Sequence, residues 1–292
     1  MNTEGDAAIF RSAIVRPPSA TFADGISSER HGRPDLVLAL TQHERYCDAL
    51  ASCGLALTRL PPDDRFPDST FVEDAAITTE HGALLARPGA PSRAGEVAAI
   101  ADALAPFFPA LDAIAEPGTL DGGDVCDAGD RAFIGISART NPAGARRAAT
   151  WLETQGRAVS TIDIRRLPRL LHLKSGLAYL GDGRIAVTEA LYEVVRDMIV
   201  LTDVSRGSVA AGPPAVLGAM AEPPLADLDC VVVPPGDEYA ANCVRVNDRV
   251  LVAAGFPRFE AKLRDLGYDT IALDMSEFEK MDGGLSCLSI RF

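Results

Sequence analysis

The sequence predicts a mixed α/β fold in which a hairpin, a helix and a strand recur about five times around a closed ring. Three observations predict it: short alternating apolar segments separated by turns, an amphipathic helical pattern after each hairpin, and strand patterns at both ends of the chain. The 292 residues are 47% hydrophobic, which is enough to bury a large core. We therefore expect a five-bladed, pseudo-symmetric α/β propeller formed by a single domain, residues 1–292.

Four repeats follow one another along the chain, each in the order hairpin, helix, strand. They are predicted at 71–87, 93–108 and 111–115; at 125–136, 142–155 and 158–164; at 176–188, 191–200 and 230–233; and at 243–253, 257–266 and 270–273. Alternating apolar residues mark the hairpins, and turn residues such as those at 181–183 divide them. Gly267 supplies the stop signal of the last helix.

The fifth repeat is split between the two ends of the chain. The segment 9–15 needs a hairpin partner, which 286–292 supplies, and the helix 34–53 and strand 56–60 complete the unit. Pairing the ends closes a ring and leaves no exposed sheet edge. An open α/β sheet is the alternative, but hairpins in every unit fit poorly with a parallel, doubly wound arrangement.

Charge and composition narrow the range of partners. There are 28 Lys and Arg residues against 41 Asp and Glu, a net charge of -13, which would repel nucleic acid and anionic membranes. The first residues are acidic where a signal peptide would be basic, and the longest uncharged stretch, 207–221, contains two prolines and is too short to span a bilayer. We expect a cytoplasmic protein that contacts neither nucleic acid nor membrane.

The six cysteines are few, and none forms a Cys-x-x-Cys pair or lies near a histidine at metal-binding spacing. We expect neither disulfides nor structural zinc.

Polar residues at the starts of the hairpins should converge, because every hairpin of such a ring begins on the same face. These positions hold Asp68, Glu73, Asp74, Asp121, Asp124, His172, Asn242, Asp282 and Cys287.

Three of these residues could form a nucleophile–base system. Cys287 follows a glycine-loosened approach to a strand, where a thiol would be presented with backbone amides nearby. His172 lies in an apolar run, and Asp121 could accept a hydrogen bond from its imidazole. The alternatives are a buried structural cysteine, a core histidine and a turn aspartate.

Charged residues indicate what such a system would act on. Asp68, Glu73 and Asp74 lie near a buried strand, where acids need a cationic partner such as a guanidinium or an amine. Arg93 and Arg139 each open a helix and together could clamp a carboxylate. A solvated acidic edge and two surface arginines are the alternatives; taken together, the residues describe a pocket for a cationic amino acid.

The motifs that carry these residues resemble those of dimethylarginine dimethylaminohydrolases, which belong to the guanidino-modifying pentein superfamily. The resemblance runs nearly end to end, through FPDSTFVED, RPGAPSR, LDGGDV, SARTN, LHLKSGLAYL, EYAANC and KMDGGLSCLSIRF. It implies a five-bladed propeller, the pentein fold, and hydrolysis of asymmetric dimethylarginine or monomethylarginine to citrulline and dimethylamine or methylamine, without a metal or cofactor.

The resemblance also implies a role for each residue of the site. Cys287 attacks the guanidinium carbon, His172 protonates the departing amine and later deprotonates water, and Asp121 orients His172. The substrate-binding residues are Asp74 for the guanidinium, with Glu73 supporting it; Asp68 and the backbone carbonyls of Ile26 and Met281 for the α-amino group; and Arg93 with Arg139 for the α-carboxylate. A bound guanidinium would favour the Cys287 thiolate.

Two segments depart from the motifs. The segment 23–34 is expected to form a lid whose Ile26, Arg30 and His31 tune which N-substituent is accepted. The paired prolines of the insertion 203–229 predict an excursion loop.

The sequence is also compatible with other functions. The same catalytic set could act on arginine or hydroxyarginine, or serve an amidinotransferase, or persist in a catalytically silent binding protein. A metal-dependent guanidine hydrolase would need short motifs of clustered Asp and His ligands, which the sequence lacks. We expect a small-molecule substrate and a monomer or homodimer.

Overall fold

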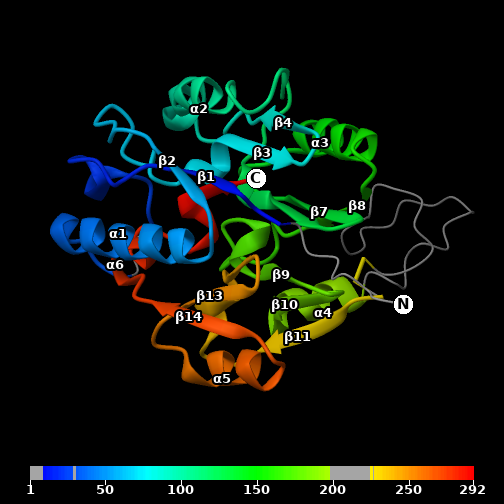
Figure 1. Cartoon of the computed structure of the whole chain (residues 1–292). Helices are drawn as coiled ribbons and strands as arrows, with labels where there is room; N and C mark the ends of the chain where they lie inside the picture. The colour runs from blue at the N-terminus through cyan, green and yellow to red at the C-terminus, as the bar shows by residue number, and fades with distance from the viewer. Residues whose placement is uncertain (1–8, 29–30, 198–223, 226) are drawn as a thin grey trace, which may run out of the picture.

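The computed structural model, which describes residues 9–28, 31–197, 224–225 and 227–292, arranges five small sheets around a central axis (Figure 1). Each sheet has three strands, in the orders β15-β1-β2, β3-β4-β5, β6-β7-β8, β11-β10-β9 and β12-β13-β14. The middle strand pairs antiparallel with one neighbour and parallel with the other. The parallel partner follows a helical crossover, as parallel pairing requires.

The strands are short, three to six residues each. Their bounds are β1 Ser12–Val15, β2 Ala56–Arg59, β3 Ala76–Thr79, β4 Gly82–Leu85, β5 Leu111–Ala113, β6 Val125–Ala128, β7 Arg131–Ile136, β8 Ala158–Asp163, β9 Leu177–Gly181, β10 Arg184–Thr188, β11 Asp229–Val233, β12 Val244–Val246, β13 Arg249–Ala253, β14 Asp269–Leu273 and β15 Ser289–Arg291.

One helix crosses over the outside of each sheet (Figure 1). These helices are α1 Leu36–Ser52, α2 Val97–Leu104, α3 Pro142–Thr154, α4 Glu189–Asp197 and α5 Pro257–Asp265; the short α6, Ser276–Glu279, precedes the last hairpin strand. Apolar residues of the helices and sheets form five buried clusters, and each cluster contains residues of neighbouring blades, so the core lies between the blades.

The two ends of the chain pair as predicted. In the antiparallel register of β1 and β15, Ile14 lies opposite Ile290. At the turn between β12 and β13, Asn247 adopts a φ of 56° and its side chain accepts a hydrogen bond from the Phe10 N–H (2.8 Å) and donates one to the Cys53 carbonyl (2.8 Å). This turn therefore links the fourth blade to the blade that closes the ring.

The five-bladed propeller and the repeat order are confirmed, whereas some boundaries were wrong. Residues 72–75 and 286–288, expected as strand, form 3-10 turns, and the helix expected at 93–108 begins as a 3-10 turn and continues only as Val97–Leu104. Gly95 lies in that turn, where a Cβ would come within 2.2 Å of the Phe66 ring, so close packing dictates the local geometry. Most of the 203–229 insertion and Arg30 lie outside the described residues.

Among the residues the structure describes, no helix combines the length and the apolar character that crossing a membrane demands. The single-domain assignment stays a prediction.

Candidate active site

Four 3-10 turns meet near the axis of the ring, each at the start of a hairpin or of a closing strand. They are η2 Val72–Ala75, η4 Gly122–Asp124, η5 Leu173–Ser175 and η8 Ser286–Leu288. Turn η4 contacts both η2 and η5, and η2 contacts η8. In η2 and η8, neighbouring residues diverge: Asp74 and Cys287 line one cavity, whereas Glu73 and Ser286 line another.

A small cavity on one side of the layer brings together most of the predicted site residues. Its lining includes Ile26, Asp68, Asp74, Arg93, Arg139, His172, Met281 and Cys287. Asp121 is fully buried behind His172, and Glu73 lies on the other side of the layer. Segments from four of the five blades therefore contribute to one site.

His172 is buried and held by a carboxylate on each side. Its Nε2 donates to Asp121 Oδ2 at 3.0 Å, and Asp121 Oδ1 accepts the Gly89 N–H at 2.7 Å. The Nδ1 atom lies 3.8 Å from Asp74 Oδ1. Burial opposes the charged imidazole, but Asp74 and the hydrogen bond to Asp121 raise the pKa of His172 to about 9. His172 is thus protonated at neutral pH and can donate a proton.

Asp74 is the charged centre of the cavity. Its carboxylate accepts Arg93 Nη1 at 2.5 Å and the Gly123 N–H at 3.0 Å. Burial works against ionisation, yet the charges of His172 and Arg93 lower the pKa of Asp74 to about 2. Only glycine fits at position 123, since a Cβ there would lie 2.7 Å from His172 Nδ1 and 2.8 Å from Asp74 Oδ1.

Cys287 lines the cavity from η8 and is partly buried. Burial, together with the negative charges of Glu73 and Asp74, raises the pKa of its thiol to about 12. The preceding residue is anchored from behind, because the Ser286 N–H donates to Asn242 Oδ1 at 2.8 Å. The thiol is therefore held in place but protonated until a cation arrives.

The two predicted arginines differ in the structure. Arg93 is buried, and its guanidinium is fully engaged by Asp74, by the Phe71 carbonyl (3.0 Å) and by Glu96, whose carboxylate accepts Nη2 at 2.8 Å and Nε at 3.1 Å. Arg139 is only partly buried, and among the described residues its guanidinium has no hydrogen-bond or ion-pair partner. Arg139 is thus available to a carboxylate, whereas Arg93 organises Asp74.

The segment around Ile26 covers the opposite end of the cavity. The Ile26 N–H donates to both Asp68 oxygens, at 3.0 and 3.3 Å, and burial raises the pKa of Asp68. Ser28 is fastened to Asp282, its N–H donating to Oδ2 at 2.5 Å and its hydroxyl to Oδ1 at 2.6 Å. The predicted lid is thereby tied to the segment that carries Met281.

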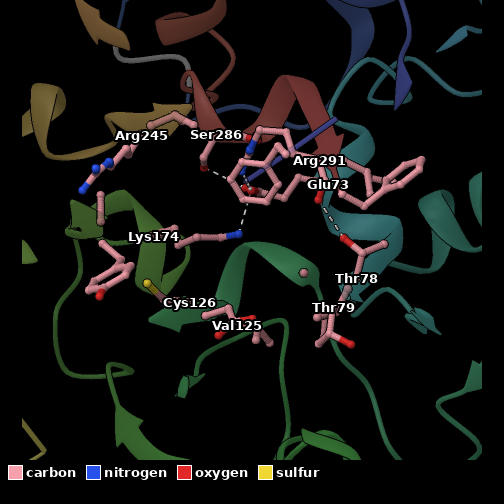
Figure 2. Close-up of a pocket in the computed structure, with 18 of the residues that line it drawn as sticks. Glu73, Thr78, Thr79, Val125, Cys126, Lys174, Arg245, Ser286 and Arg291 are labelled. Atoms are coloured by element: carbon pink, nitrogen blue, oxygen red, sulfur yellow. Dashed lines mark hydrogen bonds and ion pairs between the residues drawn. The ribbon is translucent and has the colours of Figure 1, made fainter. Parts of the chain in front are cut away.

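Glu73 is predicted to support the guanidinium site, but its side chain lies outside that cavity. Figure 2 shows it among Lys174, Ser286 and Arg291. Lys174 Nζ lies 2.6 Å from Oε1, Ser286 Oγ donates to Oε2 at 2.7 Å, and Arg291 Nη2 lies 3.3 Å from Oε1. Glu73 therefore acts on the site from the other side of the layer, through its charge, which raises the pKa of Cys287, and through its contact with Ser286.

Two further carboxylates support the site: Asp124, which was expected among the converging residues but had no assigned role, and Glu96, which was not predicted. Asp124 is fully buried and holds the residue after the histidine: its Oδ1 accepts the Leu173 N–H at 2.9 Å and its Oδ2 the Ser137 hydroxyl at 2.6 Å. Burial raises the pKa of Asp124 to about 6. Glu96 could have been found from its opposite charge three residues after Arg93, which is helical contact spacing.

Asp74, Asp121 and His172 also present donor atoms within 4.8 Å of one another, a spacing that a metal ion could use. Arg93 and the Gly123 N–H already occupy Asp74, and the Gly89 N–H already occupies Asp121. The donor set therefore fits an acid–base network better than a metal centre.

Comparisons with known proteins agree with this geometry. The family model described as "Arginine deiminase" matches residues 63–291. A dimethylarginine dimethylaminohydrolase of Pseudomonas aeruginosa is 40% identical over 97% of this chain and 100% of its own length, and one of Streptomyces coelicolor is 34% identical over 96% of each.

Among solved structures, the P. aeruginosa enzyme, as a cysteine-to-serine variant complexed with citrulline, superposes with a TM-score of 0.84 at 38% identity, covering 98% of this chain and 100% of that one. The N-terminal domain of a cyanobacterial arginine dihydrolase shares the fold, with a TM-score of 0.76 at 19% identity and 97% coverage of both chains. The chain belongs to the dimethylarginine dimethylaminohydrolase family of the pentein superfamily, within the arginine deiminase group.

Proposed function

We propose that this protein hydrolyses Nω-methylated L-arginine, asymmetric dimethylarginine or monomethylarginine, to L-citrulline and dimethylamine or methylamine. One observation carries the proposal: a single cavity is lined by Cys287 and His172 and also by the acids and the free arginine that a cationic amino acid requires. The curated relatives from P. aeruginosa and S. coelicolor bear the name of this activity.

The substrate's amino-acid end and its guanidinium have different partners. Asp68 and the carbonyls of Ile26 and Met281 would take the α-amino group, and Arg139, assisted by the charge of Arg93, the α-carboxylate. Asp74 would take the guanidinium next to Cys287. Apolar side chains of Phe71, Leu171 and Met281 also line the cavity and suit the methylene chain or an N-methyl group.

In the first half of the reaction Cys287 is the nucleophile. The arriving guanidinium adds a positive charge beside the thiol, which lowers its pKa and favours the thiolate. The thiolate sulfur bonds to the guanidinium carbon, and His172 donates its proton to the methylated nitrogen. The C–N bond then breaks, leaving a thiouronium on Cys287 and a free amine.

In the second half a water molecule attacks the same carbon. His172, now neutral, accepts one proton from the water. The hydroxyl proton of the resulting intermediate passes to solvent as the C–S bond breaks, citrulline leaves and the thiolate is restored. Asp121 contacts neither substrate nor sulfur and acts as a positioning residue, holding the imidazole through Nε2 throughout. No step needs a metal.

We further infer that the protein acts in the cytoplasm as a monomer or homodimer on this small molecule. Its net charge of -13 supports this inference, because such a charge disfavours binding to nucleic acid and to anionic membranes.

A product assay tests the proposal. Asymmetric dimethylarginine, monomethylarginine, arginine and hydroxyarginine are offered separately, and citrulline and ornithine are quantified for the wild type and for Cys287→Ser. We expect citrulline from the methylated arginines only, abolished in the variant. Ornithine from hydroxyarginine, citrulline from arginine alone, or no turnover would overturn the proposal. A chelator should leave the rate unchanged, whereas a thiol alkylator should remove it.

A further inference from the structure

A second and larger cavity lies on the other side of the layer of 3-10 turns, along the axis of the ring. It measures about 230 Å³, and Figure 2 shows part of its lining. Glu73, Lys174, Ser286 and Arg291 form its floor, and apolar residues such as Val125, Leu177 and Ile290 line its walls. The reaction described above uses none of this space.

The floor carries more positive than negative charge. Lys174 and Arg291 both pair with the single carboxylate of Glu73, at 2.6 and 3.3 Å. Glu73 is buried, and the side chains of Lys174 and Arg291 are only 16% and 13% exposed. Lys174 carries three N–H donors, and among the described residues Glu73 is the partner of one, so donors and one positive charge remain for an anion.

The charges around the rest of the cavity do not supply that anion. Arg157 pairs with Glu80 at 2.6 Å and with Asp127 at 3.1 Å, and Arg245 pairs with Asp182 at 2.8 Å. Glu80 and Asp182 are 53% and 45% exposed, so solvent screens them. Charge complementarity at the buried end, combined with apolar walls, defines a ligand with a carboxylate head and an apolar body.

We propose that this central cavity is a second binding site, for a small monocarboxylate with an apolar body, whose carboxylate contacts Lys174 and Arg291. The ligand would lie against the turns that carry the active site, because Glu73 and Ser286 are the chain neighbours of Asp74 and Cys287, and Lys174 lies two residues after His172. A ligand bound in this cavity would therefore affect the reaction without contacting the substrate.

The expected effect on the reaction is inhibition. Glu73 raises the pKa of Cys287 through the layer and Lys174 lowers it, so an anion on Lys174 adds to the effect of Glu73. A smaller fraction of Cys287 is then in the thiolate form, while the substrate-binding residues are unchanged. We therefore expect kcat to fall and KM to stay the same. This kinetic consequence rests on the proposed function, whereas binding itself does not.

Calorimetric titration with hexanoate, in the presence of saturating citrulline to keep it out of the active site, tests the proposal. Hexanamide is the neutral control. Lys174→Gln removes the floor charge, Ala178→Leu fills the cavity and leaves the floor intact, and Lys262→Gln changes an exposed lysine whose Nζ bonds the Val232 carbonyl (2.9 Å) instead. Monomethylarginine turnover is then measured with and without hexanoate.

We expect saturable binding of hexanoate to the wild type, weakened at least about tenfold in Lys174→Gln and in Ala178→Leu but not in Lys262→Gln. Hexanamide should bind the wild type as weakly as hexanoate binds the two cavity variants. Binding that is absent up to about 50 mM, equal for hexanamide, unchanged in both cavity variants, or lost when citrulline is present would overturn the proposal. If the protein fails to turn over methylated arginines, the proposed function is wrong. The proposed second binding site is judged separately, by the titrations.

Discussion

Replacing Glu96 tests the electrostatics of the site sharply, because Arg93 is the hydrogen-bond partner of its carboxylate among the described residues. The change Glu96→Gln keeps the shape of the side chain and one acceptor oxygen but places an NH₂ group against the guanidinium. Of the contacts from Arg93, at 2.8, 3.1 and 3.2 Å, those to one oxygen are lost. We expect Arg93 to lose its fixed orientation toward Asp74.

The magnitude follows from the bonds that are removed. A hydrogen bond to a charged group contributes about 1.5–3 kcal/mol, which corresponds to roughly 10- to 100-fold in an equilibrium. Since Arg93 orients Asp74, the proposed partner of the guanidinium, and assists Arg139 at the substrate's carboxylate by its charge, kcat/KM for monomethylarginine should fall by about that factor, mainly through KM. The loss is smaller than the stability of a typical domain, so the variant should fold.

Steady-state kinetics across pH provide the assay. Burial raises the pKa of Glu96 to about 7, so in the wild type KM should rise as the pH falls through neutrality and Glu96 becomes protonated. The groups facing it are Arg93, Asp68 and Asp74. In Glu96→Gln this rise should be absent and KM high throughout, and Glu96→Asp should recover part of the loss.

The matched control is Glu44→Gln, which disrupts an exposed pair in which Arg59 Nη1 bonds both Glu44 oxygens at 2.8 Å. It should leave the kinetics within about twofold of the wild type, as surface pairs contribute little. The reasoning is refuted if Glu96→Gln keeps wild-type KM and its pH dependence, or if Glu44→Gln shows the same losses.

Three further predictions concern the histidine. Asp121→Asn should lower kcat by about 10²- to 10⁴-fold, because the amide cannot hold a protonated imidazole, and an NMR titration should show the pKa of His172 reduced; an unchanged kcat would contradict its positioning role. Asp124→Ala leaves the Leu173 N–H and the Ser137 hydroxyl without their acceptor and should lower the free energy of unfolding by about 2–4 kcal/mol in urea, whereas a loss within error would show that water replaces the carboxylate. The raised pKa of His172, about 9 in the fold against about 6.5 unfolded, stabilises the protein fully below pH 6.5 and less as the pH rises through 9; the difference in unfolding free energy between the wild type and His172→Gln should decline over that window, and a flat difference would contradict the assignment.

The repeating pattern of the chain was sufficient to predict the ring. Alternation and turn residues located each hairpin, and the closing pair β1–β15 followed from two strands that lacked partners. The boundaries were less predictable, because turns such as η2 and η8 are set by contacts between blades rather than by local preference. Sequence spacing has no information about such contacts.

For the candidate site, too, the sequence predicted some features and could not predict others. Motif resemblance placed Cys287, His172, Asp68 and Asp74 around one cavity, but it could not show that Glu73, next to Asp74, faces a different one. Neighbouring residues in a 3-10 turn diverge, and which one enters the site depends on how the turn docks. The commitment of Arg93 to Asp74 and Glu96 likewise depends on a buried network from three segments.

The central claim is that Cys287 forms a covalent bond to the guanidinium carbon of a methylated arginine. Acid quenching of the reaction with monomethylarginine at early times, followed by mass analysis of the Cys287 peptide, tests it most directly. We expect an adduct of substrate minus methylamine that forms on Cys287 before citrulline and is absent from the buried Cys126 and Cys243. Citrulline release with no adduct on Cys287, or undiminished turnover by Cys287→Ser, would contradict it.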